Sequence, residues 1–534
     1  MSVISGTTHI HSNVGGGKDR KPPLTALKAA LHVLPPGEKV SLRSIADIKH
    51  FFATQERRIF FISPSNFNMM GMHEWVRGWH NINLLDCFDG QHARCLTEPD
   101  DHSRLFGGVE DVNNYLMDRP KVRALFTAGS QSEALPDQAL FLFFDEALEK
   151  KCSELGLQVA MPPNSLVREV DSKIVTTEIG NAAGVHSVPN VLARVGSYAE
   201  LQLLARGASL GERWVVQTAY GDSGKTTFFI ASEADYDRVA DKIEAEAQVK
   251  VMRWVRCVGT AIEACATRWG TFVGPLLTEL IGQPQLTPYA GGWCGNENYA
   301  EAFTPALRAD VQRKTQAMGD ALYRRGYRGS FELDYLLDLD TQEVYLGELN
   351  ARITGVSAIT NTSDYSQTTL PLFLFHLLEF DTRVDLQLDV DKFNQGLLTR
   401  GSEGVSSQLI LKHRDDVLKV ISAAPVSGVY VMGEDGELGL RQASVRRREA
   451  LAANEVYVLR IQRAGEYAYR GGDLAIMFLN GVIRDSQGQL NATGERWVQA
   501  LQASFKLRPL GQEERAAVEL ANNPANVKSA RNVR

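Results

Sequence analysis

The chain lacks the patterns of several protein classes. Its six cysteines include no Cys-x-x-Cys pair, which argues against a structural zinc site or a disulfide framework and favours a reducing compartment. Its longest apolar run, residues 370–378, is far shorter than the ~20 residues that span a bilayer, and no basic-then-apolar signal begins the chain. Basic residues are not in excess, because 57 Lys and Arg stand against 64 Asp and Glu and give a net charge of −7.

These absences argue against a general electrostatic attraction to nucleic acid or to an anionic membrane. We therefore expect small-molecule partners, no nucleic acid, no membrane role and a cytoplasmic location. The 534 residues, 44% of them hydrophobic, are enough for about three domains of ~100–200 residues, each with its own core.

Polar and apolar residues alternate within residues 326–355, on both sides of a short polar connection at 338–343. Because successive side chains of a strand point to opposite faces, this alternation predicts a β-hairpin with one apolar and one polar face. The polar face would carry Glu332, Asp334, Glu348, Asn350 and Arg352.

Two carboxylates of this face, Asp334 and Glu348, would then lie close together. At about 4 Å and an effective dielectric of about 20, two like charges repel by about 4 kcal/mol, so the pair needs a shared proton or a cation. Hard oxygen ligands favour Mg²⁺. With few protein oxygens, the ion would complete its coordination with waters and nucleotide phosphates. The planar fork of Arg352 suits a phosphate or carboxylate oxygen. A hairpin with a merely solvated charged face is the less favoured alternative, because only acids, Asn and Arg occupy the face.

This hairpin resembles the metal-binding signature of the ATP-grasp superfamily, in which an acid on one strand precedes a Glu-x-Asn-x-Arg run on the next. The matching residues are Asp334, Glu348, Asn350 and Arg352. The resemblance implies that the first three coordinate one or two Mg²⁺, with Mn²⁺ as a substitute, on the phosphates of ATP. It also implies that Arg352 stabilises the transferring phosphoryl group or the acyl phosphate. Glu332 is a rival for the first metal position, because some members carry that acid directly after the Phe of a Gly-x-Phe run.

A second glycine-rich segment, residues 219–226, differs from a Walker A P-loop only at its first position. A P-loop must run into a helix whose N-terminus holds the phosphates, whereas residues 226–230 are β-branched and aromatic and favour a strand. A P-loop NTPase would also need a separate Mg-binding Asp at the end of a parallel strand, and the sequence offers no good one. Strand, glycine-rich turn and strand instead resemble the flap that covers ATP in ATP-grasp domains.

The flap resemblance assigns further residues. It implies that the amides around Gly221, Ser223 and Gly224 cover the β- and γ-phosphates and that the ammonium of Lys225 adds catalytic positive charge. Gln217 stands where the family usually has a lysine, at the end of the preceding strand. A glutamine donates a hydrogen bond but supplies no charge, so neutralisation of the phosphates would depend more on the remaining lysines and on Mg²⁺. A plain β-hairpin with a mobile tip is the alternative.

Four residues are assigned by their order along the chain. Lys173 begins a predicted helix that ends at an Ala-Gly-Val stop, and the family has a phosphate-binding lysine at that place. Met252 and Trp254 lie in a strand-like segment, 250–255, at the place where members of the family bind adenine against a backbone hinge. Glu263 lies where many members carry an acid that contacts ribose or supports the site. Without the resemblance, the lysine would be a solvated residue and Met252 or Trp254 a core residue.

The resemblance implies a mixed α/β and α+β fold in three parts. Residues 1–160 would form a Rossmann-like pre-ATP-grasp α/β domain with a flexible N-terminus. Residues 161–385 would form the ATP-grasp domain, two α+β lobes that hold ATP between them, with a lid lobe at about 190–258. Residues 386–534 would form a C-terminal α+β domain with a frayed tail, which caps the site or supports a homodimer. A glycine-rich stretch, residues 291–296, is expected to be a mobile substrate loop.

The activity implied is that of a carboxylate–amine ligase, which forms an acyl phosphate, joins it to an amino acid or peptide, and releases ADP and phosphate. Residues 168–362 look closest to the biotin carboxylase branch, so biotin-dependent-type carboxylation is the first alternative. That branch has a carbonate-activating Glu four residues after the arginine, where this chain has Val356. A non-catalytic nucleotide-binding module is the second alternative.

Overall fold

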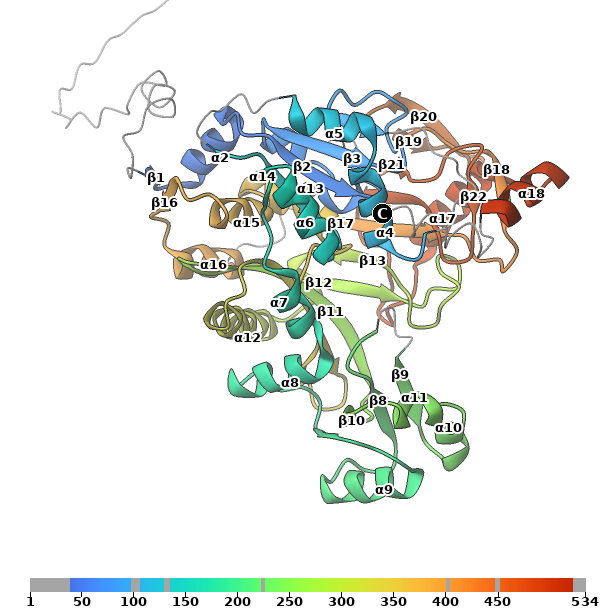
Figure 1. Ribbon diagram of the computed structural model, residues 1–534. Helices are drawn as coiled ribbons and strands as arrows, with labels where there is room; N and C mark the ends of the chain where they lie inside the picture. The colour runs from blue at the N-terminus through green and yellow to red at the C-terminus, as the bar shows by residue number, and fades with distance from the viewer. Residues whose placement is uncertain are drawn as a thin grey trace, which may run out of the picture.

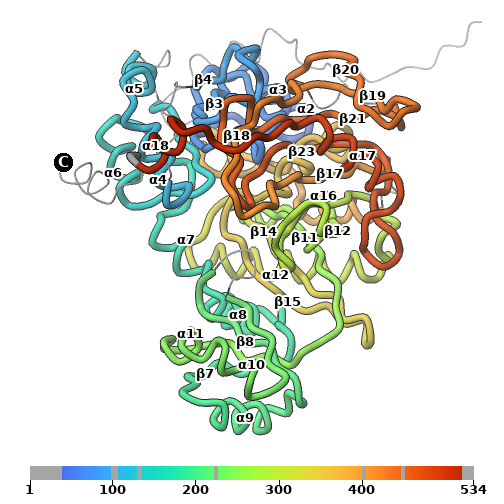
Figure 2. Tube along the Cα trace, turned by 90° about the vertical axis from the view of Figure 1, so that its right-hand side faces the viewer, coloured from blue at the N-terminus to red at the C-terminus, as the bar shows by residue number. Residues whose placement is uncertain are grey.

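The computed structural model describes residues 39–97, 106–128, 135–221, 226–399, 404–446 and 452–521. Helices and strands are mixed throughout these ranges, so the mixed α/β class expected from the sequence is confirmed. Figures 1 and 2 show a broad body that contains both the N-terminal and the C-terminal parts of the chain, and a smaller lobe that projects from it.

The N-terminal region is built on a five-stranded parallel sheet. In spatial order its strands are β4 (Cys95–Thr97), β3 (Trp79–Asn83), β2 (Ile59–Ser63), β5 (Gln138–Phe141) and β6 (Gln158–Val159). The helices of this region are α2 (Ile45–Thr54), α3 (Met72–Trp75), α4 (Val109–Met117), α5 (Pro120–Thr127) and α6 (Glu146–Glu154). Strands β2 and β5 are buried over their whole length, as is typical of parallel strands covered on both faces.

A later segment of the chain completes this N-terminal core. Strand β16 (Val384–Leu386) pairs in parallel with β1 (Val40–Leu42). Helix α15 (Phe373–Glu379) is wholly buried against the same core. The hydrophobic residues between 370 and 386 thus belong to the same core as the first strands, together with Cys265 and Phe272 from the central part of the chain.

The imidazole of His376 in α15 connects three segments. Its Nδ1 accepts a hydrogen bond of 2.9 Å from the backbone N–H of Ser330, and its Nε2 lies 2.7 Å from the carbonyl oxygen of Ala160. Acceptance at Nδ1 leaves the proton on Nε2, so the ring is neutral. Burial lowers the pKa of His376 to about 4.

The projecting lobe contains a four-stranded sheet and three helices, and we call it the lid lobe. Its strands in spatial order are β7 (Asn190–Ala193), β10 (Val249–Arg253), β8 (Trp214–Gln217) and β9 (Thr227–Ile230). Its helices are α9 (Tyr198–Gly207), α10 (Glu233–Asp237) and α11 (Ala240–Glu244). One face of the sheet packs on these helices through a core that includes Val216, Phe228 and Val251. The residues that alternate with these along each strand therefore place their side chains on the other face of the sheet.

One antiparallel sheet of ten strands runs through the body. In spatial order its strands are β15 (Val344–Asn350), β14 (Gly329–Asp338), β11 (Cys257–Thr267), β12 (Gly270–Ile281), β13 (Trp293–Asn298), β17 (Ser406–Lys412), β23 (Asp473–Asn480), β21 (Glu455–Arg460), β19 (Gly428–Met432) and β20 (Leu438–Ala443). The central part of the chain contributes the first five and the C-terminal part the last five. The two halves meet where β13 pairs with β17.

The expectation of a mobile loop at residues 291–296 is wrong. Strand β13 begins at Trp293 and hydrogen-bonds to β12 on one side and β17 on the other. Its residues Cys294 and Asn296 are fully buried. Pairing on both edges and burial hold this segment in the sheet despite the two glycines that precede it.

Helix α12 (Pro305–Arg324) covers one face of the central strands. Thr304 caps its N-terminus by accepting a hydrogen bond from the N–H of Leu307, and proline at the first helical position fits there because its missing N–H has no partner to lose. Val311 and Met318 pack this helix onto the apolar side chains of β11, β12 and β14.

The remaining elements surround the sheets. They are α7 (Asn164–Asp171), α8 (Lys173–Ala182), α13 (Ser357–Thr362), α14 (Asp364–Thr368), α16 (Val390–Thr399), α17 (Ala492–Ser504), α18 (Gln512–Ala521) and a three-stranded sheet of β22 (Tyr467–Ala468), β18 (Lys419–Ala423) and β24 (Lys506–Pro509). None of the described helices combines the length and the apolar character that crossing a membrane requires.

Candidate active site

Strands β14 and β15 form the hairpin that the sequence predicts, and their register aligns its polar residues. Asp334 lies directly opposite Glu348, and Glu332 lies opposite Asn350. Gly347 is left unpaired in β15 next to the first of these pairs, a bulge of the kind often found beside active sites. The intervening apolar side chains, such as Leu333, are buried against α12. Two pairs of oxygen-bearing side chains therefore share one face of the sheet.

The acids of this face are buried without enough positive charge to balance them. Burial is the main reason that the pKa of Glu332 rises to about 8. The pKa of Asp334 is raised well above its ordinary value, first by burial and then by the charges of Glu332 and Glu348. A cation among these oxygens would stabilise the ionised carboxylates, which burial and mutual repulsion disfavour.

The donor set fits a magnesium ion with few protein ligands. Within the described ranges, no three acidic, histidine or cysteine side chains already converge as a complete metal site. A cation at Asp334, Glu348 and Asn350 would therefore complete its coordination with waters and phosphate oxygens, which is how Mg²⁺ is usually bound beside nucleotides.

Asn350 and Arg352 form a hydrogen-bonded chain with the acids. The amide nitrogen of Asn350 donates to Asp334 Oδ2 at 3.3 Å, and its Oδ1 accepts a hydrogen bond of 2.8 Å from Arg352 Nη2. The guanidinium of Arg352 lies over the ring of Phe143, 4.6 Å from its centroid. Phe143 follows β5, so the N-terminal region fixes the direction of this arginine.

Lys173 begins helix α8, as predicted, and joins three parts of the site. Its Nζ lies 2.6 Å from Glu348 Oε1 and donates at 3.1 Å to the carbonyl oxygen of Gly221. Its backbone N–H donates to the carbonyl oxygen of Ala219. The side chain is only 5% exposed, so this lysine is held between the hairpin and the base of the flap rather than in solvent.

The segment after Thr226 is strand β9 and not a helix, which excludes a P-loop. Strands β8 and β9 pair antiparallel, with Gln217 opposite Thr227, and the side-chain amide of Gln217 donates to Thr227 Oγ1 at 3.1 Å. The two strands that flank the predicted flap are thus present and paired. Ser223, Gly224 and Lys225, at the predicted tip, lie outside the described residues.

Met252 and Trp254, both predicted to lie near adenine, differ in their surroundings. Met252 is buried in a small apolar cluster with Val188 and Tyr345, between the lid lobe and β15. Trp254 follows the end of β10, and its ring lies 3.9 Å from the guanidinium of Arg213. Only the methionine lies on the face of β10 that looks toward the hairpin.

Glu263 belongs to the row of buried acids. It pairs in register with Glu332 on the neighbouring strand and accepts a hydrogen bond from the hydroxyl of Ser357 in α13. Burial is the main cause that raises its pKa to about 6. The structure thus places this residue beside a candidate metal ligand.

Sequence reasoning missed Glu279 of β12. On the adjacent strand, Gly259 leaves room for its carboxylate, because any side chain at that glycine would collide with it. Burial raises the pKa of Glu279 well above its ordinary value, and the charges of Asp334 and Glu348 add to that effect. The sequence feature that could have revealed this residue is a single acid among the mostly apolar residues 275–281.

Sequence reasoning also missed Lys250 of β10. Its side chain is 1% exposed, and its Nζ donates to Ser187 Oγ at 2.9 Å. Burial, followed by the charge of Lys173, lowers its pKa to about 7, while Glu348 acts in the opposite direction. The sequence feature that could have revealed this residue is a lysine between two valines, Val249 and Val251, in a strand.

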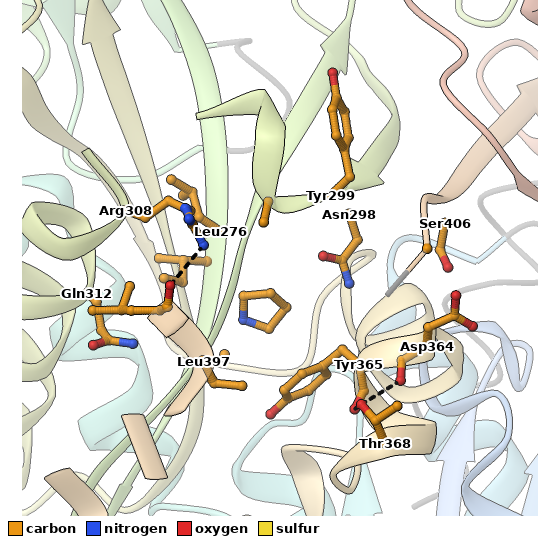
Figure 3. Close-up of a pocket in the computed structure, with 16 residues that line it drawn as sticks. Leu276, Asn298, Tyr299, Arg308, Gln312, Asp364, Tyr365, Thr368, Leu397 and Ser406 are labelled. Carbon is orange, nitrogen blue, oxygen red and sulfur yellow. Dashed lines mark hydrogen bonds between the residues drawn. The ribbon is translucent and has the colours of Figure 1, made fainter. Parts of the chain in front are cut away.

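A separate pocket lies on the α12 side of the sheet (Figure 3). Ile262 and Leu276 line it, whereas Glu263, the next residue along β11, points to the acidic face. The labelled side chains around it are Leu276, Asn298, Tyr299, Arg308, Gln312, Asp364, Tyr365, Thr368, Leu397 and Ser406. The predicted site does not use this pocket.

Comparisons with known proteins agree with the fold. No protein-family model matches the chain. The [butirosin acyl-carrier protein]–L-glutamate ligase of Niallia circulans is 22% identical over 252 residues, which span 47% of this chain and 59% of that ligase.

Among solved structures, the biotin carboxylase of Campylobacter jejuni in a βγ-ATP complex has a TM-score of 0.55 at 11% identity, over 89% of this chain and 97% of that one. The biotin carboxylase domain of 2-oxoglutarate carboxylase from Hydrogenobacter thermophilus, with MgADP, ADP and bicarbonate, gives 0.54 at 10% identity, over 88% and 94%. Phosphoribosylamine–glycine ligase from Thermotoga maritima gives 0.51 at 11% identity, over 84% and 97%.

These similarities define an ATP-grasp fold, as the sequence predicted. The chain therefore shares the fold of these biotin carboxylases and of this ligase.

Proposed function

We propose that the protein is an ATP-dependent ligase that activates a carboxylate as an acyl phosphate and joins it to an amine. The observation that carries this proposal is the register of β14 and β15, which sets Asp334 opposite Glu348 and Glu332 opposite Asn350. Lys173, from a distant helix, reaches the same face. Buried carboxylates, an amide and a lysine that contacts the base of the predicted flap are the parts that binding of a metal nucleotide requires.

Asp334, Glu348 and Asn350 would hold Mg²⁺, which neutralises charge on the phosphates of the bound nucleotide. Glu332 lies beside them as the alternative first ligand. The described end of the flap, at Gly221, lies next to Lys173, which supports phosphates at this place. The similar fold solved with MgADP supports the same choice of ligand. The roles of Ser223, Gly224 and Lys225 stay predictions.

The chemistry has two steps. A carboxylate oxygen of the substrate attacks the γ-phosphorus of ATP, the bond to the bridging oxygen breaks, and ADP leaves. The amine then attacks the acyl carbon, loses a proton, and displaces inorganic phosphate. Arg352, held by Asn350 and Phe143, would stabilise the charge that develops on the phosphoryl group. Positioning and charge supply most of the rate, so few acid–base side chains are needed.

An amino acid is the amine that we propose, because the relative found by sequence is named for the ligation of L-glutamate to an acyl-carrier protein. Biotin-type carboxylation is the second candidate, and the similarity to biotin carboxylases favours it. Val356, at the position where that branch has its base, is buried among Ala261, Leu277 and Ile359 and cannot accept a proton. This supports the ligase. A homodimer stays a prediction.

The test is a coupled assay of ADP release in the presence of Mg²⁺, with amino acids and carboxylates supplied in pairs and with bicarbonate in a separate arm. ADP release that needs both a carboxylate and an amine supports the ligase. Release that needs bicarbonate supports the carboxylase, and nucleotide binding without turnover under any pair supports the non-catalytic module. Glu348→Gln is the inactive reference.

A further inference from the structure

We infer that Lys250 supplies, from the neighbouring strand, the positive charge for the α- and β-phosphates of the nucleotide that Gln217 cannot supply. The inference rests on the proposed function, since it assigns a residue to the phosphates of the nucleotide bound there. It concerns a lysine that the order of motifs in the sequence did not single out.

Register brings the two residues together. Lys250 of β10 lies directly opposite Gln217 of β8 in the antiparallel pair, and Figure 1 shows these strands together in the lid lobe. Residues paired in this way project to the same face of a sheet. Their neighbours Val251 and Val216 pack into the core of the lid lobe, so Lys250 and Gln217 share the face that is turned away from that core.

Lys250 forms no ion pair with a described carboxylate, although the charge of Glu348 acts on it. Its Nζ donates a hydrogen bond to a neutral hydroxyl, Ser187 Oγ. Lys173, by contrast, already pairs with Glu348 at 2.6 Å. A buried ammonium without a counter-charge is costly, and an anionic ligand removes that cost.

Position along the strand indicates which phosphates are involved. Met252, two residues further on the same face, packs toward Tyr345 at the proposed adenine end, about 7 Å away at the usual rise of a strand. Lys173 contacts Ala219 and Gly221, which follow Gln217 in the chain and so lie on the side of the Lys250–Gln217 pair away from Met252 and Val215. Lys250 thus lies between the adenine end and the metal end, where the first two phosphates of a nucleotide would lie.

The charge state of the amine is consistent with this role. Burial lowers the pKa of Lys250 to about 7, so a phosphate beside it would restore the ammonium and make binding stronger below neutral pH than above it.

The test measures the affinity of Lys250→Gln for adenosine, AMP, ADP and ATP by calorimetry at pH 7. One charge-assisted hydrogen bond corresponds to a change of roughly 10- to 100-fold. We expect a loss of that size for ADP and ATP and no change for adenosine. Lys242→Gln, an exposed lysine of the same lobe, is the matched control and should bind all four ligands as the wild type does.

Exchange of the two side chains makes the test specific. The double variant Lys250→Gln with Gln217→Lys returns the charge to the opposite strand and should restore ATP affinity to within about threefold of wild type, since the charge remains on the same face. Melting temperatures are measured for every variant to check the fold.

Equal losses for adenosine and ATP, or no loss for ATP, would overturn the inference while leaving the proposed function intact. Failure of the double variant to recover ATP affinity in a folded protein would overturn it as well. Failure of the wild type to bind MgATP would overturn both.

Discussion

Lys173 and Glu348 form an ion pair of 2.6 Å that joins the first turn of α8 to strand β15, 175 residues later. The same ammonium also donates to the carbonyl oxygen of Gly221 at the base of the flap. The direction of the Glu348 carboxylate is therefore set partly by residues outside the hairpin. Three segments that are far apart in the sequence, α8, the base of the flap and β15, meet at this ammonium.

Replacement of Glu348 by Gln should reduce ADP release by about 100-fold, because loss of a metal carboxylate removes about 3 kcal/mol of charge stabilisation. The side chain is one-third exposed, and glutamine can still accept the hydrogen bond from Lys173, so the melting temperature should stay close to that of the wild type. Asp340→Asn is the control, since this acid lies in the exposed turn of the same hairpin. Wild-type turnover in Glu348→Gln would refute the metal assignment.

Replacement of Asp334 by Asn should make the metal-free protein more stable at pH 8. The pKa of Asp334 is raised well above its ordinary value by burial and by its acidic neighbours, so the folded state loses stability as the pH rises above the ordinary carboxyl range. Asparagine does not titrate, and the difference in melting temperature between the two proteins should shrink as the pH falls toward 4.

Magnesium nucleotide gives the complementary measurement on the same pair of proteins. MgADP should raise the melting temperature of the wild type and have little effect on Asp334→Asn, because the variant lacks a ligand for the cation. A variant that is less stable than the wild type at pH 8, or equally stabilised by MgADP, would contradict the assignment.

His376 should make the protein sensitive to acid. Its pKa is lowered to about 4 from an ordinary value of about 6.5, so the stability that depends on the neutral ring is complete above pH 6.5 and is lost as the pH falls toward 4. The difference corresponds to about 3 kcal/mol. Urea unfolding of wild type and His376→Gln between pH 7 and 4.5 measures it, and the variant should be less stable at pH 7 with a shallower decline.

The control for this prediction is His186→Gln, since His186 is exposed. It should follow the wild-type curve at every pH. Parallel curves for the wild type and His376→Gln would show that protonation of His376 is not what weakens the fold in acid.

Glu297 should be essential for the junction between the central and C-terminal strands. Its fully buried carboxylate lies 2.8 Å from Arg484 Nε and accepts hydrogen bonds from the backbone N–H groups of Ile483 and Arg484 and from the hydroxyl of Thr278. Glu297→Gln leaves the arginine without a counter-charge and should cost about 3 kcal/mol in the free energy of unfolding by urea. Glu434→Gln, at an exposed position, should cost almost nothing; equal costs would contradict this role.

The hairpin and the flap were predictable because their signals are local. The alternation around Asp334 and Glu348 fixes the face of each side chain within one short segment, and the β-branched residues after Thr226 exclude a helix. The order of these two motifs along the chain was enough to predict the ATP-grasp fold.

Glu279 and Lys250 were not predictable for the opposite reason. The first reaches the acidic face only because Gly259, on another strand, makes room for it. The second matters only because β10 pairs with β8 in a register that sets it opposite Gln217. Pairings of this kind depend on which strands become neighbours, and one sequence alone does not give that information.

The pairing of β13 with β17 has a practical consequence for dissecting this protein. In a fragment that stops before Ser406, the backbone N–H and C=O groups of β13 that pair with β17 would have no partner. An exposed strand edge of this kind is a template for aggregation. Expression of residues 1–405 alone should therefore yield insoluble material, unless charged residues or a designed cap shield that edge.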